Sequence, residues 1–226
     1  MNIAGIDINI HRSKRKTVSI FIERDGSVSA RVPQELTEQE LEKVVKAKSY
    51  HIYKHRAEWE LLNARQIKRE YVSGQSFLYL GRNYRLKLVD ENIKGLVFKN
   101  NRFYLNHNTS ENGEEYFKQF YKKKLEQKLP PIIKQYATSL GVQPNKVGVM
   151  ELQHRWASCS EKRNINFHWK CAMAPIDVLH YIVAHELAHL IHLNHTPAFW
   201  NEVDKVIPSY QKKQEWLKYN GSGMSL

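Results

Sequence analysis

Apolar and polar residues alternate with a period of two near the amino-terminal end of the chain. The pattern covers residues 6–10 and returns at residues 18–22. Because successive side chains of a strand point to opposite faces, this alternation predicts half-buried strands. Asp25 and Gly26 form a dipeptide typical of tight hairpin turns. We therefore expect a small antiparallel meander over residues 3–32.

A helix should follow this meander. Thr37 can cap its first turn while Glu40 reaches back to the backbone, and Leu36 and Leu41 can form an apolar contact around the same turn. The helix is then expected to run towards Glu70. The capping signal and the apolar signal agree on where this helix begins.

Strand-like segments return after Gly74. Residues 77–80 and 84–88 lie on either side of a Gly-Arg-Asn turn, and a further hairpin is expected to turn at Asn100 and Asn101. These segments predict a second β-rich layer.

Residues 114–129 carry apolar residues at helical spacing. Proline lacks a backbone N–H and its ring clashes with the preceding turn, so Pro130 and Pro131 are expected to interrupt this helix. Gly141 can end its continuation. Residues 220–226 are expected to form a frayed tail.

The composition favours a globular protein that has no membrane span. With 42% hydrophobic residues, the chain can bury a substantial core. No run approaches the roughly 18 apolar residues that a span requires, and the first residues lack a continuous apolar segment, so we expect neither a transmembrane protein nor a secreted precursor. Cys159 and Cys171 are too few for a disulfide scaffold. The expected location is a reducing cytoplasm.

The formal net charge of +12 is concentrated before residue 151. Residues 1–150 contain 27 Lys or Arg against 16 Asp or Glu, whereas residues 151–226 contain eight against seven. Such an excess is typical of proteins that contact nucleic acid, and solvated helix faces produce it as well. DNA binding through residues 1–150 is therefore one hypothesis. Its candidate contacts are Arg12, Lys14, Arg15, Lys16, Lys122, Lys123 and Lys124.

Residues 183–200 hold the most specific chemical motif. His185, Glu186 and His189 form H-E-x-x-H within an apolar helical pattern. A spacing of four residues places both imidazoles on one helix face, about one turn apart, where they can bind a single Zn²⁺. Glu186 lies beside them and can act on water. Because a motif this short also occurs by chance, the surrounding residues have to support it.

A catalytic zinc site needs a third protein ligand and one position left for water. His195 lies ten residues beyond His185, past an expected helix end near Leu193. His192 is the competing ligand. On a continued helix it stands roughly 10.5 Å along the axis from His185, which is too far for one tetrahedral site.

Two alternatives for this region are weaker. Metzincins share the H-x3-H-x5-H spacing, but His192 stands where their motif has Gly and no Met-turn follows. Thr196 and Pro197 predict the start of another helix, which carries Glu202 and Asp204. These two acids are weaker ligand candidates because downstream acids commonly lie on solvated faces.

With these motifs in place, the chain resembles the YgjP-like metallopeptidases, zincins related to the WLM and SprT-like groups. The resemblance spans most of the sequence. Its segments are HRSKRKTVSIFIERDGSVSARVP, SGQSFLYLGRNYRLKLV, HRWASCSEKRNINFHWK, APIDVLHYIVAHELAHL and NHTPAFW. The family pattern RWGSCS has Gly where this chain has Ala157. If that position requires a positive φ, Ala157 is strained.

The resemblance implies an α+β fold, with a zincin-like minimal metallopeptidase domain behind an amino-terminal β-rich and helical extension. We place the extension, which includes one long helix, at residues 1–110. The metallopeptidase domain is expected at residues 111–220 and the tail at residues 221–226.

The RWASCS segment is expected to join a strand that ends near Trp156 to a strand over residues 164–169. In zincins of this type, such a strand resembles the edge against which an extended substrate pairs. Arg155 and Trp156 are then candidate substrate-binding residues. Cys159 and Cys171 are more typical of packed residues than of nucleophiles or ligands.

The expected activity is zinc-dependent hydrolysis of peptide bonds in protein or peptide substrates. By the resemblance, His185, His189 and His195 match the zinc ligands, and Glu186 matches the general base that accepts a proton from the metal-bound water. Candidates to assist the leaving amine or the oxyanion are Tyr181, Tyr210 and His192.

The rival hypothesis is a DNA-binding or DNA-associated module whose zinc site is structural or vestigial. In a combined version, a peptidase cleaves DNA-bound protein, as the SprT-like proteins do. Glu186 distinguishes the two classes, because a structural site needs no carboxylate between its histidines.

Overall fold

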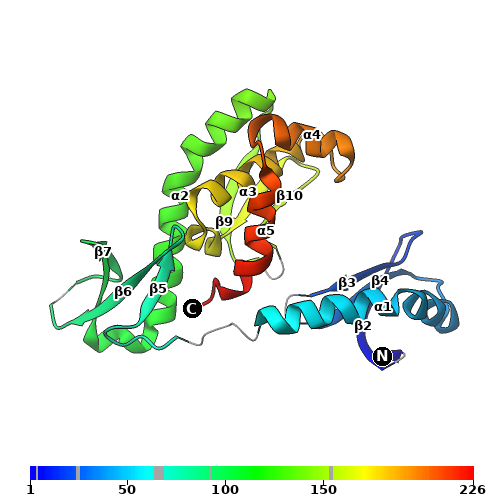
Figure 1. Ribbon diagram of the computed structural model, residues 1–226, viewed down its shortest axis with the longest axis horizontal. Helices are drawn as coiled ribbons and strands as arrows, with labels where there is room; N and C mark the ends of the chain where they lie inside the picture. Colours follow the sequence, from blue (N-terminus) through cyan, green and yellow to red (C-terminus); the bar gives the residue numbers. More distant parts are fainter. Residues whose placement is uncertain (4, 24–25, 64–68, 92, 153–154) are drawn as a thin grey trace. The chain divides into compact units, whose positions relative to one another are not determined.

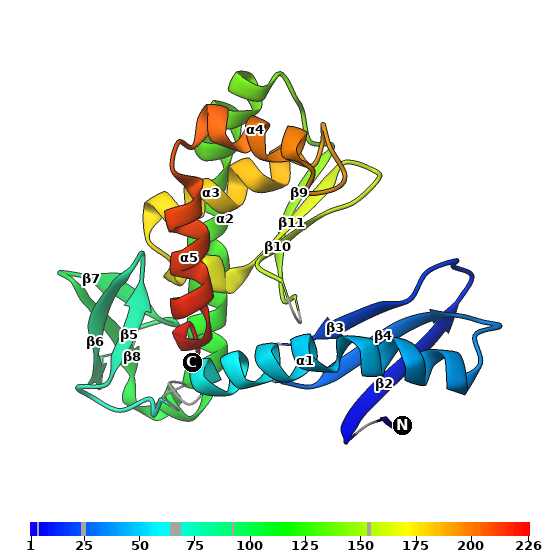
Figure 2. The ribbon, with the colours of Figure 1, turned by 45° about the vertical axis from the view of Figure 1, so that its right-hand side comes forward.

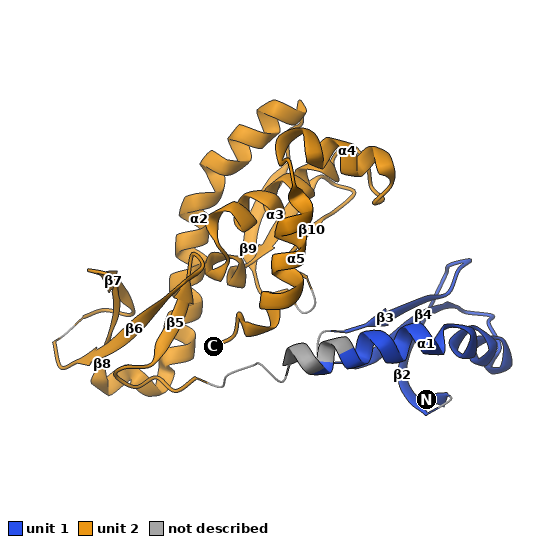
Figure 3. Cartoon of the chain, in the orientation of Figure 1, with its two compact units in different colours: residues 1–66 blue, residues 67–226 orange. Residues whose placement is uncertain are grey.

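The computed structural model describes residues 1–226 with the exception of residues 4, 24–25, 64–68, 92 and 153–154, and without the side chains of residues 58, 59 and 61–63. The chain divides into two compact units, residues 1–66 and residues 67–226 (Figure 3). Each unit has its own apolar core.

The first unit contains a four-stranded sheet of order β1-β2-β4-β3. Its strands are β1 (Asn2–Ile3), β2 (Ile6–Ser13), β3 (Ser19–Ile22) and β4 (Val28–Pro33). The predicted hairpin is confirmed, since β3 and β4 pair antiparallel on either side of Gly26, whose φ is 83°. The predicted antiparallel meander is wrong, because β2 pairs with β4 in parallel. The alternating pattern determines which face of a strand is buried. It is compatible with both a parallel and an antiparallel neighbour, so it does not determine the direction of pairing.

The helix of this unit is α1 (Glu38–Asn63), and it packs on the sheet (Figure 1). Its start is confirmed. The Thr37 hydroxyl accepts a hydrogen bond from the Glu40 N–H at 3.3 Å, and the Glu40 carboxylate accepts one from the Thr37 N–H at 2.9 Å. The expected continuation towards Glu70 falls largely on residues 64–68, outside the described residues.

The second unit begins with another four-stranded sheet, of order β5-β6-β8-β7. Its strands are β5 (Ser76–Tyr79), β6 (Arg82–Val89), β7 (Val97–Lys99) and β8 (Arg102–Asn106). Both predicted hairpins are confirmed, since β5 pairs antiparallel with β6 and β7 with β8. Asn100 and Asn101 have φ values of 49° and 56°, the left-handed conformation that a tight two-residue turn requires.

A short helical turn, η1 (His107–Asn112), leads into α2 (Gly113–Leu140), which continues through Pro130 and Pro131. The predicted interruption is therefore wrong. Both prolines lie on the exposed side of α2, whereas Leu129 and Ile132 on its other side are buried. Hydrogen bonds are lost only where water can replace them, and burial of the flanking residues holds the helix.

A three-stranded sheet and three helices complete the second unit. The elements are β9 (Lys146–Met150), β10 (Ala157–Cys159), β11 (Asn164–His168), η2 (Trp169–Met173), α3 (Ile176–Ala188), α4 (Pro197–Val206), α5 (Tyr210–Asn220) and η3 (Gly221–Gly223). Strand β11 is central, because it pairs in parallel with β9 and antiparallel with β10. Helix α3 packs against α2, α4, α5 and β10 (Figures 1 and 2).

The sheet β5–β8 shares one apolar core with α2 and α3. Phe77 and Phe103 from the sheet, Phe117 from α2 and Leu179 from α3 are all fully buried in it. The compact units accordingly divide near residue 66, whereas the sequence placed a boundary at residue 110. Strand and helix patterns do not reveal which layers share a core.

The last residues of the chain are packed. Met224 is 1% exposed, and the Arg69 guanidinium donates a hydrogen bond to the Ser225 carbonyl at 2.6 Å. A Cβ on Gly221 would lie 2.6 Å from the Trp156 ring, so backbone and indole are in close contact. The prediction of a frayed tail is therefore wrong. The buried Met224 side chain and the hydrogen bond from Arg69 fix this segment to the rest of the second unit.

We expect Met224→Ala to lower the free energy of unfolding by about 2–5 kcal/mol, the usual cost of emptying a buried Met site. The measurement is urea unfolding followed by circular dichroism. Met150→Ala is the matched control, because Met150 is 44% exposed and its truncation should have little effect. Equal, small losses in both variants would contradict the packed carboxyl-terminal segment.

Candidate metal centre

Helix α3 positions the first two histidines. It is buried on almost every side, and His185 and Glu186 lie in its last turn, while His189 follows its end at Ala188. The His189 N–H still donates to the His185 carbonyl at 3.3 Å, so His189 keeps helical geometry. Both imidazoles therefore lie on one side of the helix, with ring centroids 4.9 Å apart.

The ring orientation of His189 is set by the backbone beyond the helix. His189 Nδ1 lies 3.1 Å from the His192 carbonyl oxygen. A carbonyl only accepts hydrogen bonds, so Nδ1 carries the proton and Nε2 keeps a free lone pair. Metal-binding histidines are commonly held by such a bond. His192 therefore contributes its backbone, and its ring is not among the groups that converge.

His195 comes from the segment between α3 and α4. The chain turns back after α3, and His195 Nε2 approaches His185 Nε2 to 3.0 Å. Ligand atoms of His185, His189 and His195 all lie within 4.8 Å of one another. The structure thus brings together the three histidines that the sequence singled out. Helix α3 ends at Ala188, before the expected end near Leu193. The connecting segment before His195 is therefore longer than expected, and it can turn back so that His195 reaches His185.

The surroundings keep these histidines neutral. Burial is the main cause that lowers the pKa of His185, to about 3, and the neighbouring His189 and His195 add to it. Burial also lowers the pKa of His189, although the hydrogen bond of His189 to the His192 backbone opposes this shift. Burial likewise lowers the pKa of His195. Neutral imidazoles are the form that binds a metal.

Glu186 is buried beside the histidines. It is 6% exposed, and its Oε2 has no hydrogen-bond partner among the described residues. Burial raises the pKa of Glu186 to about 8, and the charge of Arg155 opposes that shift. Arg155 therefore lies close enough to act electrostatically on this carboxylate.

An aromatic wall encloses the site, and the sequence analysis did not find it. The Phe199 ring is fully buried and its centroid lies 4.6–4.9 Å from those of all three histidines. Trp200 stacks on His195 at 5.4 Å, and Tyr210 stacks on Trp200 at 4.9 Å. The available signal was a Phe-Trp pair in the first turn of the helix directly after His195.

Two of the three candidate assisting residues, Tyr181 and Tyr210, lie together near His185. Tyr181 is buried one turn before His185, with ring centroids 5.8 Å apart, and Tyr210 stacks on it at 6.4 Å. Burial raises the pKa of Tyr181. The weaker ligand candidates lie elsewhere. Glu202 pairs with Lys205 at 2.6 Å, and Asp204 is exposed.

Strand β10 forms an open edge next to α3 (Figure 2). It begins at Ala157, which pairs with Phe167. Ala157 does not have a positive φ, so the backbone strain considered for this position does not occur. The strand therefore starts after Trp156, where the sequence predicted one to end. Trp156 directs its ring at Gly221, whereas Arg155 is exposed.

The two cysteines are free thiols. Cys171 is fully buried and its thiol contacts the Trp156 carbonyl at 3.2 Å, which agrees with a packed residue. Cys159 lies in β10, where burial and then the Glu186 charge raise the pKa of its thiol. Both causes disfavour a thiolate.

The predicted DNA contacts are scattered over the two units. Arg12 donates to the Gln34 and Leu36 carbonyls, and Arg15 donates to the Thr17 and Ser19 hydroxyls. The Arg12 guanidinium therefore connects β2 to the segment after β4, and the Arg15 guanidinium connects the loop after β2 to the start of β3. The remaining candidates in the second unit are Lys122, Lys123 and Lys124, on α2.

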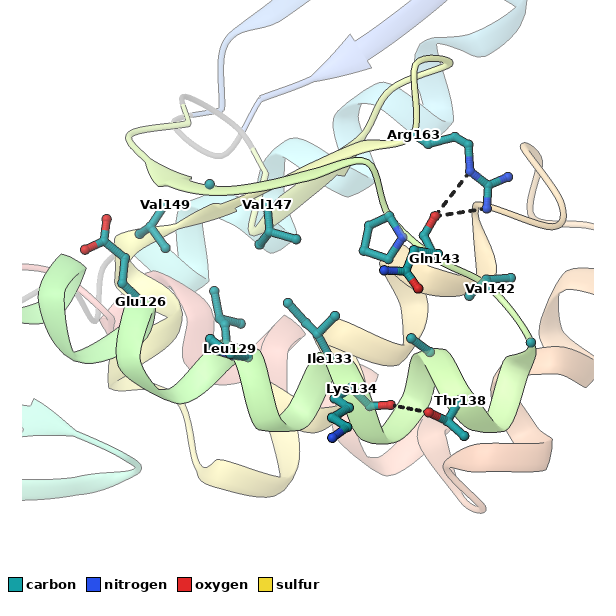
Figure 4. A pocket seen from close by; sticks show the side chains of 15 residues that line it. Glu126, Leu129, Ile133, Lys134, Thr138, Val142, Gln143, Val147, Val149 and Arg163 are labelled. Atoms are coloured by element: carbon teal, nitrogen blue, oxygen red, sulfur yellow. Dashed lines mark hydrogen bonds between the residues drawn. The ribbon is translucent and has the colours of Figure 1, made fainter.

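A groove of about 1050 Å³ separates α2 from β9 (Figure 4). Leu129 and Ile133 of α2 face Val147 and Val149 across it. None of the histidines or acids discussed above lines this groove, so it is separate from the candidate metal centre.

An H-E-x-x-H helix, a third histidine that returns to it and an open strand edge beside it are the features of a metallopeptidase. The comparison with known families agrees. The chain belongs to the YgjP-like family, whose metallopeptidase domain matches residues 16–220. It is accordingly a peptidase, a hydrolase of protein or peptide substrates, and this membership implies a metal in its site.

Two solved structures are similar to part of the chain. They are the metallopeptidase zymogens abylysin of Pyrococcus abyssi and jannalysin of Methanocaldococcus jannaschii, each 24% identical. The first match covers 42% of this chain and 97% of abylysin, with a TM-score of 0.38. The second covers 39% of this chain and 89% of jannalysin, with a TM-score of 0.35. No curated protein matches the chain. Among the described residues, no helix has the length and apolar character needed to cross a membrane.

Proposed function

We propose that this chain hydrolyses peptide bonds with a zinc ion held by His185, His189 and His195. The observation that carries the proposal is the convergence of three imidazoles within 4.8 Å beside the buried carboxylate of Glu186. Three protein ligands are the number that a catalytic zinc site uses, because its fourth position is left for water or substrate.

The residues fit a divalent cation. Two ring nitrogens that face each other at 3.0 Å repel unless a proton or a cation lies between them. A buried carboxylate oxygen without a partner is costly, and a nearby cation reduces that cost. Nitrogen donors suit zinc better than magnesium or calcium, which prefer oxygen.

Zinc, when bound, would acidify an attacking water and polarise the scissile carbonyl. Glu186 is the general base in this proposal. It accepts the proton of the water at its unpartnered Oε2 and hands it to the leaving amine. Its burial excludes bulk water and raises its pKa, and a cation bound to the histidines would lower that pKa again, because a nearby positive charge favours the carboxylate that accepts the proton.

The other residues orient the reaction. Phe199 and Trp200 pack on the histidine rings and limit their rotation. The edge of β10 offers backbone groups that an extended substrate can pair with, which supports Arg155 as a substrate-binding residue. Tyr181 and Tyr210 are the remaining candidates to stabilise the oxyanion.

The rival reading, a DNA-associated module with a structural or vestigial zinc site, is less well supported. A structural site is closed by four protein ligands, whereas three converge here among the described residues. Such a site also has no use for a buried carboxylate without a partner.

Removal of the metal tests the proposal. We expect a strong chelator to abolish cleavage of an unfolded protein substrate such as casein, and stoichiometric Zn²⁺ to restore it, because the site then regains its Lewis acid. Cleavage and metal content are measured on the same samples, with Mg²⁺ as the control addition. Cleavage that persists in zinc-free protein would refute the proposal.

A further inference from the structure

The sheet β5–β8 has a basic outer face. Its inner face packs on α2 through Phe77, Leu86 and Phe103, all of which are buried. Side chains alternate along a strand, so the intervening positions project to the other side. These positions include Arg85, Lys87, Lys99 and Arg102, which are exposed, and Tyr104, which is partly exposed.

No acid balances these cations within the sheet. The four strands contain no Asp or Glu, and among the described residues none of the four cations forms an ion pair. Lys99 lies directly opposite Arg102. Like charges in directly opposite positions destabilise a sheet, so this pair is not explained by the stability of the fold.

Protection of sheet edges explains only part of the pattern. Charged residues, Lys above all, commonly prevent edge strands from pairing with other chains, and β7 is such an edge. Strands β6 and β8 are interior, however, and they carry Arg85, Lys87 and Arg102. Three of the four cations therefore lie where edge protection has no role.

An aromatic ring lies among the cations. Tyr104 is directly opposite Lys87 on one neighbouring strand and Val97 on the other. The Lys99 ammonium is 4.9 Å from the centroid of the Tyr104 ring. A partly exposed aromatic ring surrounded by cations offers a stacking surface next to sites for phosphate.

We propose that this outer face, formed by Arg85, Lys87, Lys99, Arg102 and Tyr104, binds single-stranded nucleic acid. The four cations match the negative charge of a phosphate backbone, and the tyrosine can stack on a base. An acidic polypeptide would also satisfy the cations, but it has no base to stack on Tyr104. The inference is independent of the metal centre and assigns nucleic-acid contact to a different surface from Lys122, Lys123 and Lys124.

The test is fluorescence anisotropy of a labelled oligothymidylate of roughly 16 nucleotides, mixed with the full chain at about 50 mM salt. We expect the triple variant Arg85→Gln/Lys99→Gln/Arg102→Gln to bind at least about 10-fold more weakly. It should also reduce the slope of log K against log salt by about 2, because each lost phosphate contact contributes about 0.7 for single strands.

Two further variants sharpen the result. Tyr104→Leu keeps all charges and should weaken binding about 10-fold through the loss of stacking. Lys122→Gln/Lys123→Gln/Lys124→Gln removes the same charge from α2 and should leave binding almost unchanged. Circular dichroism checks folding, and relief of the Lys99–Arg102 repulsion should keep the face variant at least as stable as the parent.

Other outcomes overturn the proposal. Equal losses in the two triple variants would show that only net charge matters. Full affinity in Tyr104→Leu, together with tight binding of polyglutamate, would identify an acidic polypeptide as the partner. Absence of oligothymidylate binding at about 50 mM salt, where phosphate contacts are strong, would leave the face without a nucleic-acid partner.

Discussion

Glu186→Gln should abolish detectable peptide hydrolysis while the protein keeps its fold and its zinc. The amide has the shape of the carboxylate but cannot accept a proton, so the general-base contribution of about 10²- to 10⁴-fold in kcat is lost. Because the amide occupies the same buried volume as the carboxylate and creates no cavity, the substitution should leave the melting temperature nearly unchanged. The measurements are casein cleavage, zinc content and thermal unfolding on the same preparation.

The matched control is Glu215→Gln, which makes the same chemical change on the exposed surface of α5. It should retain parental kcat. If the Glu186→Gln variant binds a full complement of zinc and cleaves casein at the parental rate, Glu186 is not the general base. If the Glu186→Gln variant loses zinc instead, the Glu186 carboxylate either binds the metal or holds one of the metal-binding residues in position.

His195→Ala should have the largest effect on metal content. Partners that only orient a ligand typically change affinity about 10- to 100-fold, so removal of a ligand should exceed 100-fold. His195 is the proposed ligand that lies outside α3, and its loss would leave a two-histidine site. Competition with a chromophoric chelator measures the zinc affinity, and elemental analysis gives the stoichiometry, which we expect to be one ion per chain in the parent.

His192→Ala is the control for this experiment. Its backbone carbonyl, which orients His189, is retained in the variant, so the affinity should fall far less than in His195→Ala. If zinc is retained in His195→Ala and lost in His192→Ala or Glu202→Ala, the third ligand must be reassigned. A carboxylate ligand would make the site gluzincin-like.

Local chemistry predicted the elements of this protein well where the signal lies within one turn. The Thr37–Glu40 reciprocal cap and the Asn100-Asn101 turn occur as expected, because their hydrogen bonds and φ values depend on neighbouring residues. The prediction that Pro130 and Pro131 interrupt the helix was wrong because its outcome depends on residues outside the local segment. The cost of Pro130 and Pro131 is local, but the burial that offsets it comes from residues far along the chain.

For the candidate site, helix periodicity predicted that His185 and His189 share one face, because residues four apart lie one above the other. The sequence favoured His195 over His192 as the third ligand, since His192 on a continued helix would stand too far from His185. In the structure α3 ends at Ala188, and His195 Nε2 lies 3.0 Å from His185 Nε2. Phe199 and Trp200 were missed because their contacts with the histidine rings exist only after α4 folds back.

The sequence by itself determined the H-E-x-x-H motif, the start of α1, the hairpins β3–β4, β5–β6 and β7–β8, and the face that each of these strands buries. Tertiary structure alone decided that β2 pairs in parallel with β4, that residues 67–110 share a core with α2, and that Met224 is buried. The physical reason is common to these cases. Periodicity specifies which side of an element is apolar, whereas the partner for that side is chosen by packing between residues that are distant in the chain.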